Sequence, residues 1–386
     1  MKTYQAGIDV GSTTVKLVVL DENGQMIFGQ YQRHLSHTQR ALSDLLKQAR
    51  AALGECALEL RATGSGAINL AKALGIPFVQ EVVAVAQALE RVAPQVDVAI
   101  ELGGEDAKII YFKGGLEERM NGVCAGGTGS FIDQMAALLQ TDASGLDREA
   151  AHYQQIYPIA ARCGVFAKSD IQPLINEGAP IENLAASIFQ AVVNQTISGL
   201  ACGHKIKGNV AFLGGPLTYL SELRKRFIET LELKPEEVIF PENSKYFVAI
   251  GAAYMADGEQ EVKLSELLDR VNSVDPLADS ATKHVEPLFK DEAEYRAFKE
   301  RHAKAQIKRK ELRSCKGPLF LGIDAGSTTT KAALIDQDKN LVYSFYRNNE
   351  GNPLEATKLM LNELYCMLPA DTYIANATVT GYGEGL

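Results

Sequence analysis

The same pattern of apolar and polar residues occurs at two places in the chain. Residues 7–16 read Gly-Ile-Asp-Val-Gly-Ser-Thr-Thr-Val-Lys, and residues 322–331 differ from them only at the fourth and ninth positions. Each copy ends one apolar run and begins another, which predicts a strand, a tight polar turn and a second strand. The turn is rich in backbone N–H groups and hydroxyls, and an acid precedes it. Such a turn can wrap a phosphate while the acid faces a metal ion.

Between the two copies, strand-like and helix-like segments alternate. Short apolar runs predict strands over residues 58–62, 96–102, 108–112 and 210–213. Helical spacing of apolar positions predicts helices over residues 37–53, 82–93, 184–206 and 249–255. Another helix is expected to begin at Ser130, and Ser130 with Asp133 resembles a capping box. This alternation predicts an α/β fold for residues 1–256.

Residues 257–317 have a different character. The stretch 299–313 is strongly basic and has no apolar stripe wide enough for a core, so we expect a charged helical connector on the surface. From Leu319 the first pattern restarts, with a hairpin, a helix over residues 353–368 and a strand. We therefore expect a partial second unit over residues 318–386, and we expect the chain to be a fragment of a longer polypeptide.

The composition is that of a soluble globular protein with more than one domain, because 46% of the 386 residues are apolar and 23% are charged. The net charge of -9 argues against nucleic acid or an acidic membrane surface as a partner. No apolar run approaches the roughly 20 residues that span a bilayer. The sequence begins with a strand-like segment, so we expect no signal peptide and a cytoplasmic location.

The six cysteines do not form the disulfide framework of a small secreted protein. Cys124 and Cys163 are 39 residues apart, which is not the local spacing of a ferredoxin or zinc site. Each precedes a predicted helix, whose N-terminus favours a thiolate, and a two-fold dimer would bring two such thiolates from each subunit to its axis. From the spacing alone, a buried free thiol is the usual explanation. Cys202, on the predicted helix 184–206, is expected in the core.

Three glycine-containing turns each follow a predicted apolar strand, at residues 9–16, 101–106 and 213–216. Ligands of α/β proteins bind at the ends of the strands, where such turns lie. A single Gly-Gly pair after a strand is commonly only a turn. The three turns together, with acids in the first two, indicate one composite ligand site.

The order of these motifs resembles the actin, Hsp70 and sugar-kinase superfamily, which has a two-lobed, ribonuclease H-like ATPase fold. The three turns look like its first phosphate, second phosphate and adenosine motifs. One branch is more similar, namely the ATP-dependent activators of 2-hydroxyacyl-CoA dehydratases and the ATPase subunits of benzoyl-CoA reductase. The resemblance covers nearly all of residues 1–256, and it is carried by residues 7–16, 62–66, 103–108, 121–129, 162–170 and 213–215. Glu101 and Glu105 stand where this family usually has Asp and Gln.

The resemblance implies an ATPase that binds ATP or ADP with Mg²⁺ between its lobes. It implies that Asp9 and Asp106 face the hydrated metal ion, and that Glu101 or Glu105 orients the attacking water. These four acids are therefore the candidate catalytic residues. The candidate nucleotide-binding residues are Gly11, Ser12, Thr13, Thr14, Lys16, Gly103, Gly104, Gly127, Thr128, Gly214 and Gly215.

The resemblance also implies that Cys124 and Cys163 bind a [4Fe-4S] cluster shared between the two subunits of a homodimer. The implied function is ATP-dependent one-electron reduction of an iron–sulfur dehydratase or reductase component, either a separate protein or a later part of the same polypeptide. Reduced ferredoxin or flavodoxin is the implied electron donor. Two alternatives remain open. A small-molecule kinase, such as a sugar kinase, of the same superfamily would have no need of the two cysteines, and a nucleotide-sensing scaffold would be non-catalytic and colourless.

Overall fold

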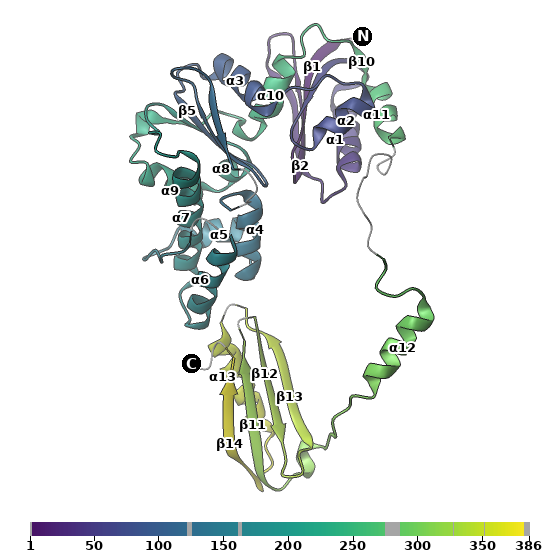
Figure 1. The fold of residues 1–386 in the computed structure, drawn as a ribbon, viewed down its shortest axis with the longest axis vertical. Helices are drawn as coiled ribbons and strands as arrows, with labels where there is room; N and C mark the ends of the chain where they lie inside the picture. The colour runs from purple at the N-terminus through teal and green to yellow at the C-terminus, as the bar shows by residue number, and fades with distance from the viewer. Residues whose placement is uncertain are drawn as a thin grey trace. The chain divides into compact units, whose positions relative to one another are not determined.

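Three β-sheets organise the chain in the computed structural model, which describes residues 2–121, 126–160, 164–274, 286–326, 328–350 and 352–381. The chain divides into two units (Figure 1). The first unit contains two of the sheets and comprises Met1–Ala136, Asp142–Ala167 and Glu182–Ser280. The second unit contains the third sheet and comprises Ala137–Thr141, Lys168–Ile181 and Ala281–Leu386.

The first sheet, which with its helices forms the first lobe, begins with the predicted hairpin. Its strands are β1 (Thr3–Val10), β2 (Thr14–Leu20), β3 (Met26–Arg33), β4 (Ala57–Thr63) and β10 (Val262–Lys263), in the order β10-β4-β1-β2-β3. Strands β1, β2 and β3 pair antiparallel, whereas β4 runs parallel to β1. Its faces are covered by α1 (Thr38–Leu53), α2 (Ala67–Leu74), α3 (Glu81–Val92), α10 (Phe247–Tyr254) and α11 (Leu264–Ser273).

The two faces of this sheet belong to different cores because successive side chains of a strand point in opposite directions. Leu17 and Val19 pack with α1, α2 and α11. Val18 and Leu20 pack with α3, α10 and apolar residues of the second sheet. Helices α3 and α10 lie between the two sheets (Figure 1), so this second core joins the two lobes.

Helix α10 comes so close to β1 and α3 that both crossings require glycine. A Cβ atom on Gly7 would lie 1.9 Å from the backbone oxygen of Ala249. A Cβ atom on Gly251 would lie 1.7 Å from the backbone oxygen of Ala84. Because no side chain tolerates such distances, glycine at these two positions sets the close packing at the centre of the unit.

The second sheet forms the second lobe and repeats the plan of an antiparallel hairpin followed by a parallel strand. Its strands are β5 (Val98–Leu102), β6 (Ala107–Tyr111), β7 (Glu117–Met120), β8 (Val210–Leu213) and β9 (Val238–Ile239), in the order β7-β6-β5-β8-β9. Strands β5 and β8 are parallel, and β8 is parallel to β9. The remaining helices between residues 129 and 230 are α4 (Gly129–Leu138), α5 (Ala143–Ala150), α6 (Gly164–Asn176), α7 (Ile181–Leu200), α8 (Gly215–Tyr219) and α9 (Ser221–Thr230).

Helix α7 is shorter than the predicted helix 184–206, and this corrects the expectation for Cys202. The helix ends at Leu200. Cys202 follows with a φ angle of +47°, and Gly203 with a φ angle of +88°, both in the left-handed region that a helix cannot continue through. Cys202 is therefore exposed in a turn and does not lie in the core.

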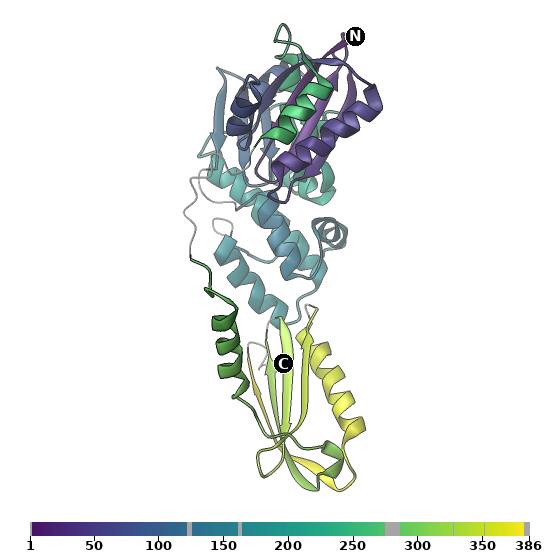
Figure 2. The ribbon, with the colours of Figure 1, turned by 90° about the vertical axis from the view of Figure 1, so that its right-hand side faces the viewer.

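The third sheet repeats the first hairpin in the second unit. Its strands are β11 (Gly317–Ala325), β12 (Thr329–Ile335), β13 (Leu341–Asn348) and β14 (Thr372–Thr380), in the order β13-β12-β11-β14. Strand β14 runs parallel to β11, as β4 does to β1. Helix α13 (Pro353–Met367) packs along one face of this sheet (Figure 2), where Met360 and Leu364 are fully buried.

The segment 257–317, expected to be a connector, is not uniform. Strand β10 pairs with β4, and α11 buries Leu264, Leu267 and Val271 in the core of the first lobe. The first lobe therefore continues past residue 256. Helix α12 (Glu292–Ala303) has no buried residue, as expected for a solvated helix. Within the described residues, no helix combines the length and apolar character that crossing a bilayer requires.

Candidate functional site

The first turn, between β1 and β2, places a buried ion pair at the end of the first sheet. Asp9 is the register partner of Lys16, and the distance from Asp9 Oδ2 to Lys16 Nζ is 2.6 Å. The backbone N–H of Gly11 donates to the oxygen of Thr14 at 2.9 Å, which closes the turn. Burial opposes the charge on Lys16, but the carboxylate of Asp9 outweighs burial and raises the pKa of Lys16 above its ordinary value.

The second turn, between β5 and β6, holds another buried lysine. Lys108 is 3% exposed, and its Nζ forms ion pairs with Asp106 Oδ2, at 2.7 Å, and with Glu81 at the start of α3. The strand register places Lys108 directly opposite Glu101. Burial opposes the charge on Lys108, but these three surrounding carboxylates outweigh it and raise the pKa of Lys108 well above its ordinary value.

The first and second turns meet at Gly104. A Cβ atom on Gly104 would lie 2.1 Å from Thr13 Oγ1 and 2.8 Å from Thr13 Cγ2. Any side chain at position 104 would therefore displace Thr13. The backbone of the second turn thus lies directly against the hydroxyl of the first, as expected for two loops that hold one phosphate chain.

A small polar cavity lies between these two turns. It is lined by Asp9, Gly11, Ser12, Thr13, Thr14, Lys16, Ser65, Glu81, Glu101, Gly103, Gly104, Asp106, Lys108 and Val248. Most of the predicted phosphate-binding and acidic residues are therefore brought together. The cavity has hydroxyls, backbone amides, two lysines and four carboxylates, a set that can bind a polyphosphate together with a hard cation.

Of the two acids considered for orienting water, only Glu101 lines this cavity. Glu101 is 6% exposed, and its Oε2 is buried with no hydrogen-bond partner among the described residues. Burial raises the pKa of Glu101 to about 7, although the nearby Lys108 opposes the rise. Glu105 is exposed and does not line the cavity.

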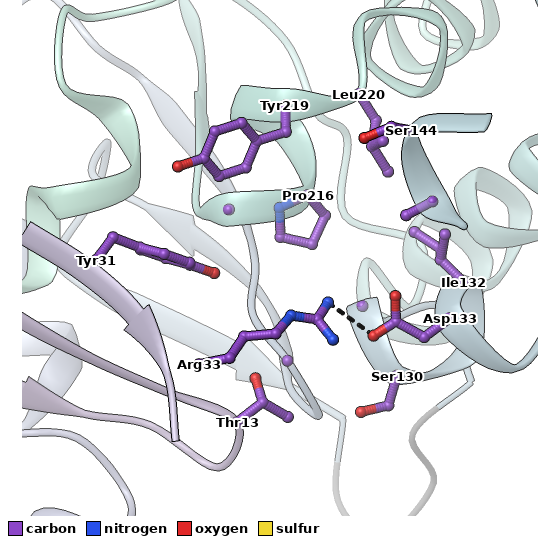
Figure 3. Close-up of a pocket in the computed structure, with 14 residues that line it drawn as sticks. Thr13, Tyr31, Arg33, Ser130, Ile132, Asp133, Ser144, Pro216, Tyr219 and Leu220 are labelled. Atoms are coloured by element: carbon purple, nitrogen blue, oxygen red, sulfur yellow. Dashed lines mark hydrogen bonds and ion pairs between the residues drawn. The ribbon is translucent and has the colours of Figure 1, made fainter. Parts of the chain in front are cut away.

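The third turn borders a larger cavity of about 190 Å³ (Figure 3). Thr13 and Gly104 line both cavities, so the two adjoin where the first and second turns meet. From the third turn, Gly215 and Pro216 line the larger cavity, and Gly214, with a φ angle of +89°, lies behind them against Leu102. The other lining residues are Tyr31, Arg33, Gly129, Ser130, Ile132, Asp133, Ala143, Ser144, Tyr219 and Leu220.

The larger cavity has an apolar side and a polar side. Figure 3 shows Tyr31, Tyr219 and Pro216 along one side and the ion pair between Arg33 and Asp133 on the other. The rings of Tyr31 and Tyr219 contact edge to face, with centroids 5.9 Å apart. Such a cavity suits a flat ring that carries polar substituents, and the adjoining polar cavity suits the phosphates attached to it.

The remaining predicted residues lie elsewhere. Gly127 and Thr128 line neither cavity, but they lie just before α4, where Gly129 N–H donates to the oxygen of Gly103 at 3.0 Å. Cys124 and Cys163 lie outside the described residues. In the described part of the chain, no group of three or more His, Cys, Asp or Glu side chains has the arrangement of a metal site.

Sequence reasoning missed Glu81, Lys108, Tyr31, Arg33 and Tyr219 as site residues. A signal for Lys108 was present, because a lysine inside the apolar strand Ala-Lys-Ile-Ile-Tyr calls for a buried partner. Glu81 gave no such signal, because an acid in the first turn of a helix is ordinary.

Comparison with known proteins relates most of the first unit to a family of ATPases. The model of the BadF/BadG/BcrA/BcrD ATPase family matches residues 6–256. The 2-hydroxyisocaproyl-CoA dehydratase activator of Clostridioides difficile is 29% identical over 272 residues, which cover 68% of this chain and 98% of the activator.

Two solved structures are similar to the chain. Component A of (R)-2-hydroxyglutaryl-CoA dehydratase from Acidaminococcus fermentans matches with a TM-score of 0.57 and 26% identity, over 70% of this chain and 99% of that one. The activator of 2-hydroxyisocaproyl-CoA dehydratase from Clostridium difficile, which has bound ADPNP, matches with a TM-score of 0.56 and 24% identity, over 74% of this chain and 100% of that one. The predicted two-lobed ATPase fold is therefore confirmed.

Proposed function

The chain belongs to the BadF/BadG/BcrA/BcrD ATPase family, and we propose that it is an ATP-dependent activator of a 2-hydroxyacyl-CoA dehydratase-type partner. In this proposal, ATP hydrolysis drives one electron from a [4Fe-4S] cluster of the activator to an iron–sulfur component of the partner. The observation that carries the proposal is the meeting of the three turns around two adjoining cavities. One cavity suits polyphosphate and the other suits a nucleoside.

The phosphates of ATP would lie in the small polar cavity. The hydroxyls of Ser12, Thr13 and Thr14 and the backbone amides of the first turn donate to phosphate oxygens, as in other phosphate-binding turns. Gly103 and Gly104 let the second turn approach from the opposite side. The base and ribose would lie against Gly215 and Pro216 in the larger cavity.

The residues present fit a Mg²⁺ ion. Asp9 and Asp106 both line the small polar cavity and supply the carboxylate oxygens that Mg²⁺ prefers. When bound, Mg²⁺ would neutralise negative charge on the phosphates during hydrolysis. Lys16 forms an ion pair with Asp9 Oδ2 at 2.6 Å, which holds this carboxylate at the cavity.

In this proposal, Glu101 would orient the attacking water and accept its proton. A general base works best when its pKa lies near the working pH, and the pKa of Glu101 is raised to about 7. Its Oε2 is the atom that would receive the proton. Because hydrolysis of ATP depends mainly on positioning and electrostatics, the rigid strand β5 is a suitable support for this carboxylate.

Helix α4 provides a physical link from the nucleotide to the expected cluster. The N–H groups of Gly129 and Ser130 donate to the oxygens of Gly103 and Gly104, at 3.0 and 2.7 Å. A movement of the second turn on hydrolysis would therefore move the start of α4, which follows Cys124 in the chain. Such coupling requires only that ATP and its products favour different positions of the lobes.

Cys124 and Cys163 are the proposed cluster ligands, two from each subunit of a homodimer, with reduced ferredoxin or flavodoxin as donor. Support for these assignments comes from the residue types, their places before α4 and α6, and the family. The cluster would store the electron that the partner receives. The electron acceptor would be an iron–sulfur dehydratase or reductase component.

The test is anaerobic purification followed by iron and sulfide analysis and an assay of ATP hydrolysis without added substrate. We expect roughly four iron and four sulfide per two chains, and hydrolysis that Asp9→Ala abolishes. Cys124→Ala/Cys163→Ala should lose iron and keep ATP binding. Iron that persists in the double variant would exclude these ligands, and a phosphorylated small molecule as the product would favour a kinase.

A further inference from the structure

Arg33, the last residue of β3, reaches into the larger cavity beside the first turn. The β2–β3 register pairs Arg33 with Thr14 and Tyr31 with Lys16, so two alternate residues of β3 lie level with the first turn. Figure 3 shows the guanidinium of Arg33 near Thr13, extending across the cavity toward Asp133. A strongly cationic side chain thus lies where the two cavities adjoin.

The partner of Arg33 belongs to the other lobe. Arg33 Nη2 donates to Asp133 Oδ2 at 2.8 Å, and Asp133 lies in the first part of α4. In the capping box predicted for Ser130 and Asp133, the backbone N–H of Ser130 would donate to the side chain of Asp133. Instead, this N–H donates to the backbone oxygen of Gly104, and the side chain of Asp133 accepts from Arg33. Arg33 therefore joins β3 to the same helix whose N-terminus is attached to the second turn.

This ion pair is weak enough to be exchanged. The side chain of Arg33 is 60% exposed and that of Asp133 is 37% exposed, and ion pairs of this kind contribute little because water competes with them. A phosphate group carries more charge than a carboxylate and matches the guanidinium fork in the same bidentate way. Phosphates bound at Thr13 and Gly104 would lie beside Arg33, since these two residues line both cavities.

We infer that Arg33 exchanges Asp133 for a phosphate of the bound nucleotide and thereby releases α4 from β3. This inference rests on the proposed ATP site and adds a nucleotide-responsive contact between the lobes. Asp133 competes with the nucleotide for Arg33. Arg33 is a positioning residue, because its change of partner when phosphate binds alters the contact between β3 and α4. Without nucleotide the pair holds β3 to α4, and with nucleotide α4 is free to follow the second turn.

The two partners therefore have opposite effects on ATP affinity. Isothermal titration calorimetry of the anaerobic protein with Mg²⁺ and a non-hydrolysable ATP analogue measures these effects. Arg33→Gln should weaken ATP binding by about tenfold or more, because a charge-assisted contact to phosphate is lost. Asp133→Asn should tighten ATP binding by up to about fivefold, because the competitor of the phosphate is lost. Adenosine, which lacks phosphate, should lose far less affinity for Arg33→Gln than ATP does.

The matched controls are Arg270→Gln and Glu266→Gln, which break an exposed ion pair of 2.7 Å on α11 and should leave ATP affinity unchanged. A purely structural pair predicts that Arg33→Gln and Asp133→Asn both weaken ATP binding, and that result overturns the exchange. Unchanged affinity in either variant overturns it as well. If the wild-type protein binds no ATP, the proposed function and the exchange are both overturned. If the wild-type protein binds ATP and the two variants bind it with the same affinity, the exchange alone is overturned.

Discussion

Replacing Glu101 by glutamine should stabilise the protein without nucleotide or metal, and the gain should grow as the pH rises. The carboxyl of Glu101 is buried, and burial raises its pKa from an ordinary value of 4.5 to about 7. A folded-state pKa above the unfolded-state value means that the folded protein binds this proton more tightly. The contribution of Glu101 to stability is therefore fully present below about pH 4.5 and is lost as the pH rises toward 7.

The magnitude follows from the two pKa values. Glutamine resembles the protonated acid at every pH, so the variant lacks the cost of burying a charge. Linkage gives an advantage in the free energy of unfolding of about 1 kcal/mol at about pH 5 and about 3 kcal/mol at about pH 8. The difference between variant and wild type should therefore change by about 2.5 kcal/mol over this range.

Urea denaturation followed by far-UV circular dichroism, with EDTA and without nucleotide, measures this difference at each pH. Glu105→Gln is the matched control, because Glu105 is an acid of the same turn that is exposed. The control is a surface substitution and should change the free energy of unfolding by less than about 0.5 kcal/mol. If the advantage of Glu101→Gln were constant between about pH 5 and about pH 8, or were larger at the lower pH, the carboxyl would not be held neutral by burial.

Two further substitutions test other parts of the site. Asp9→Ala should lower the free energy of unfolding by about 3 kcal/mol or more, because it leaves Lys16 buried without its partner. Asp324→Ala, the same change in the exposed second copy, should cost at most about 1 kcal/mol, and equal losses in urea denaturation would contradict this difference. Gly104→Ala should reduce kcat/KM for ATP by at least about tenfold, because its Cβ would collide with Thr13 Oγ1. Gly322→Ala, whose Cβ would meet nothing closer than 3.9 Å, is the matched control, and a fully active Gly104→Ala would show that the turns need not meet.

The hairpins and their turns could be predicted from the sequence because the signals are local. Strands β1 and β2 are short apolar runs, and the Asp-Val-Gly-Ser-Thr-Thr segment between them has the residues of a tight turn. Helix α11 was overlooked although Leu264, Leu267 and Val271 have helical spacing, because charged neighbours concealed its apolar side. A prediction based on the average composition of a segment does not detect an apolar stripe as narrow as that of α11.

The partners of the charged site residues could not be predicted, because they are distant in sequence. Arg33 and Asp133 are 100 positions apart, and Lys108 and Glu81 are 27 apart. Each pair joins two different elements that only the tertiary packing brings together. The raised pKa of Glu101 has the same origin, because burial rather than residue type causes it.

The repeated ten residues separate what local sequence determines from what packing adds. In both copies the acid and the lysine are register partners and form an ion pair, of 2.6 Å for Asp9 and 2.9 Å for Asp324. The side chains of Asp9 and Lys16 are 3% and 12% exposed, whereas those of Asp324 and Lys331 are 42% and 39% exposed.

The difference comes from neighbours outside the repeat. The backbone of Ala249 in α10 would lie 1.9 Å from a Cβ on Gly7, but the nearest atom to the equivalent Cβ on Gly322 is 3.9 Å away, in the adjacent strand. Among the described residues, only the first copy also meets a second turn, at Gly104, and lies near a buried carboxyl such as Glu101. The sequence of the turn therefore specifies the hairpin and its ion pair. The buried surroundings of the first copy come from the second turn and from helices α3 and α10, which pack around it.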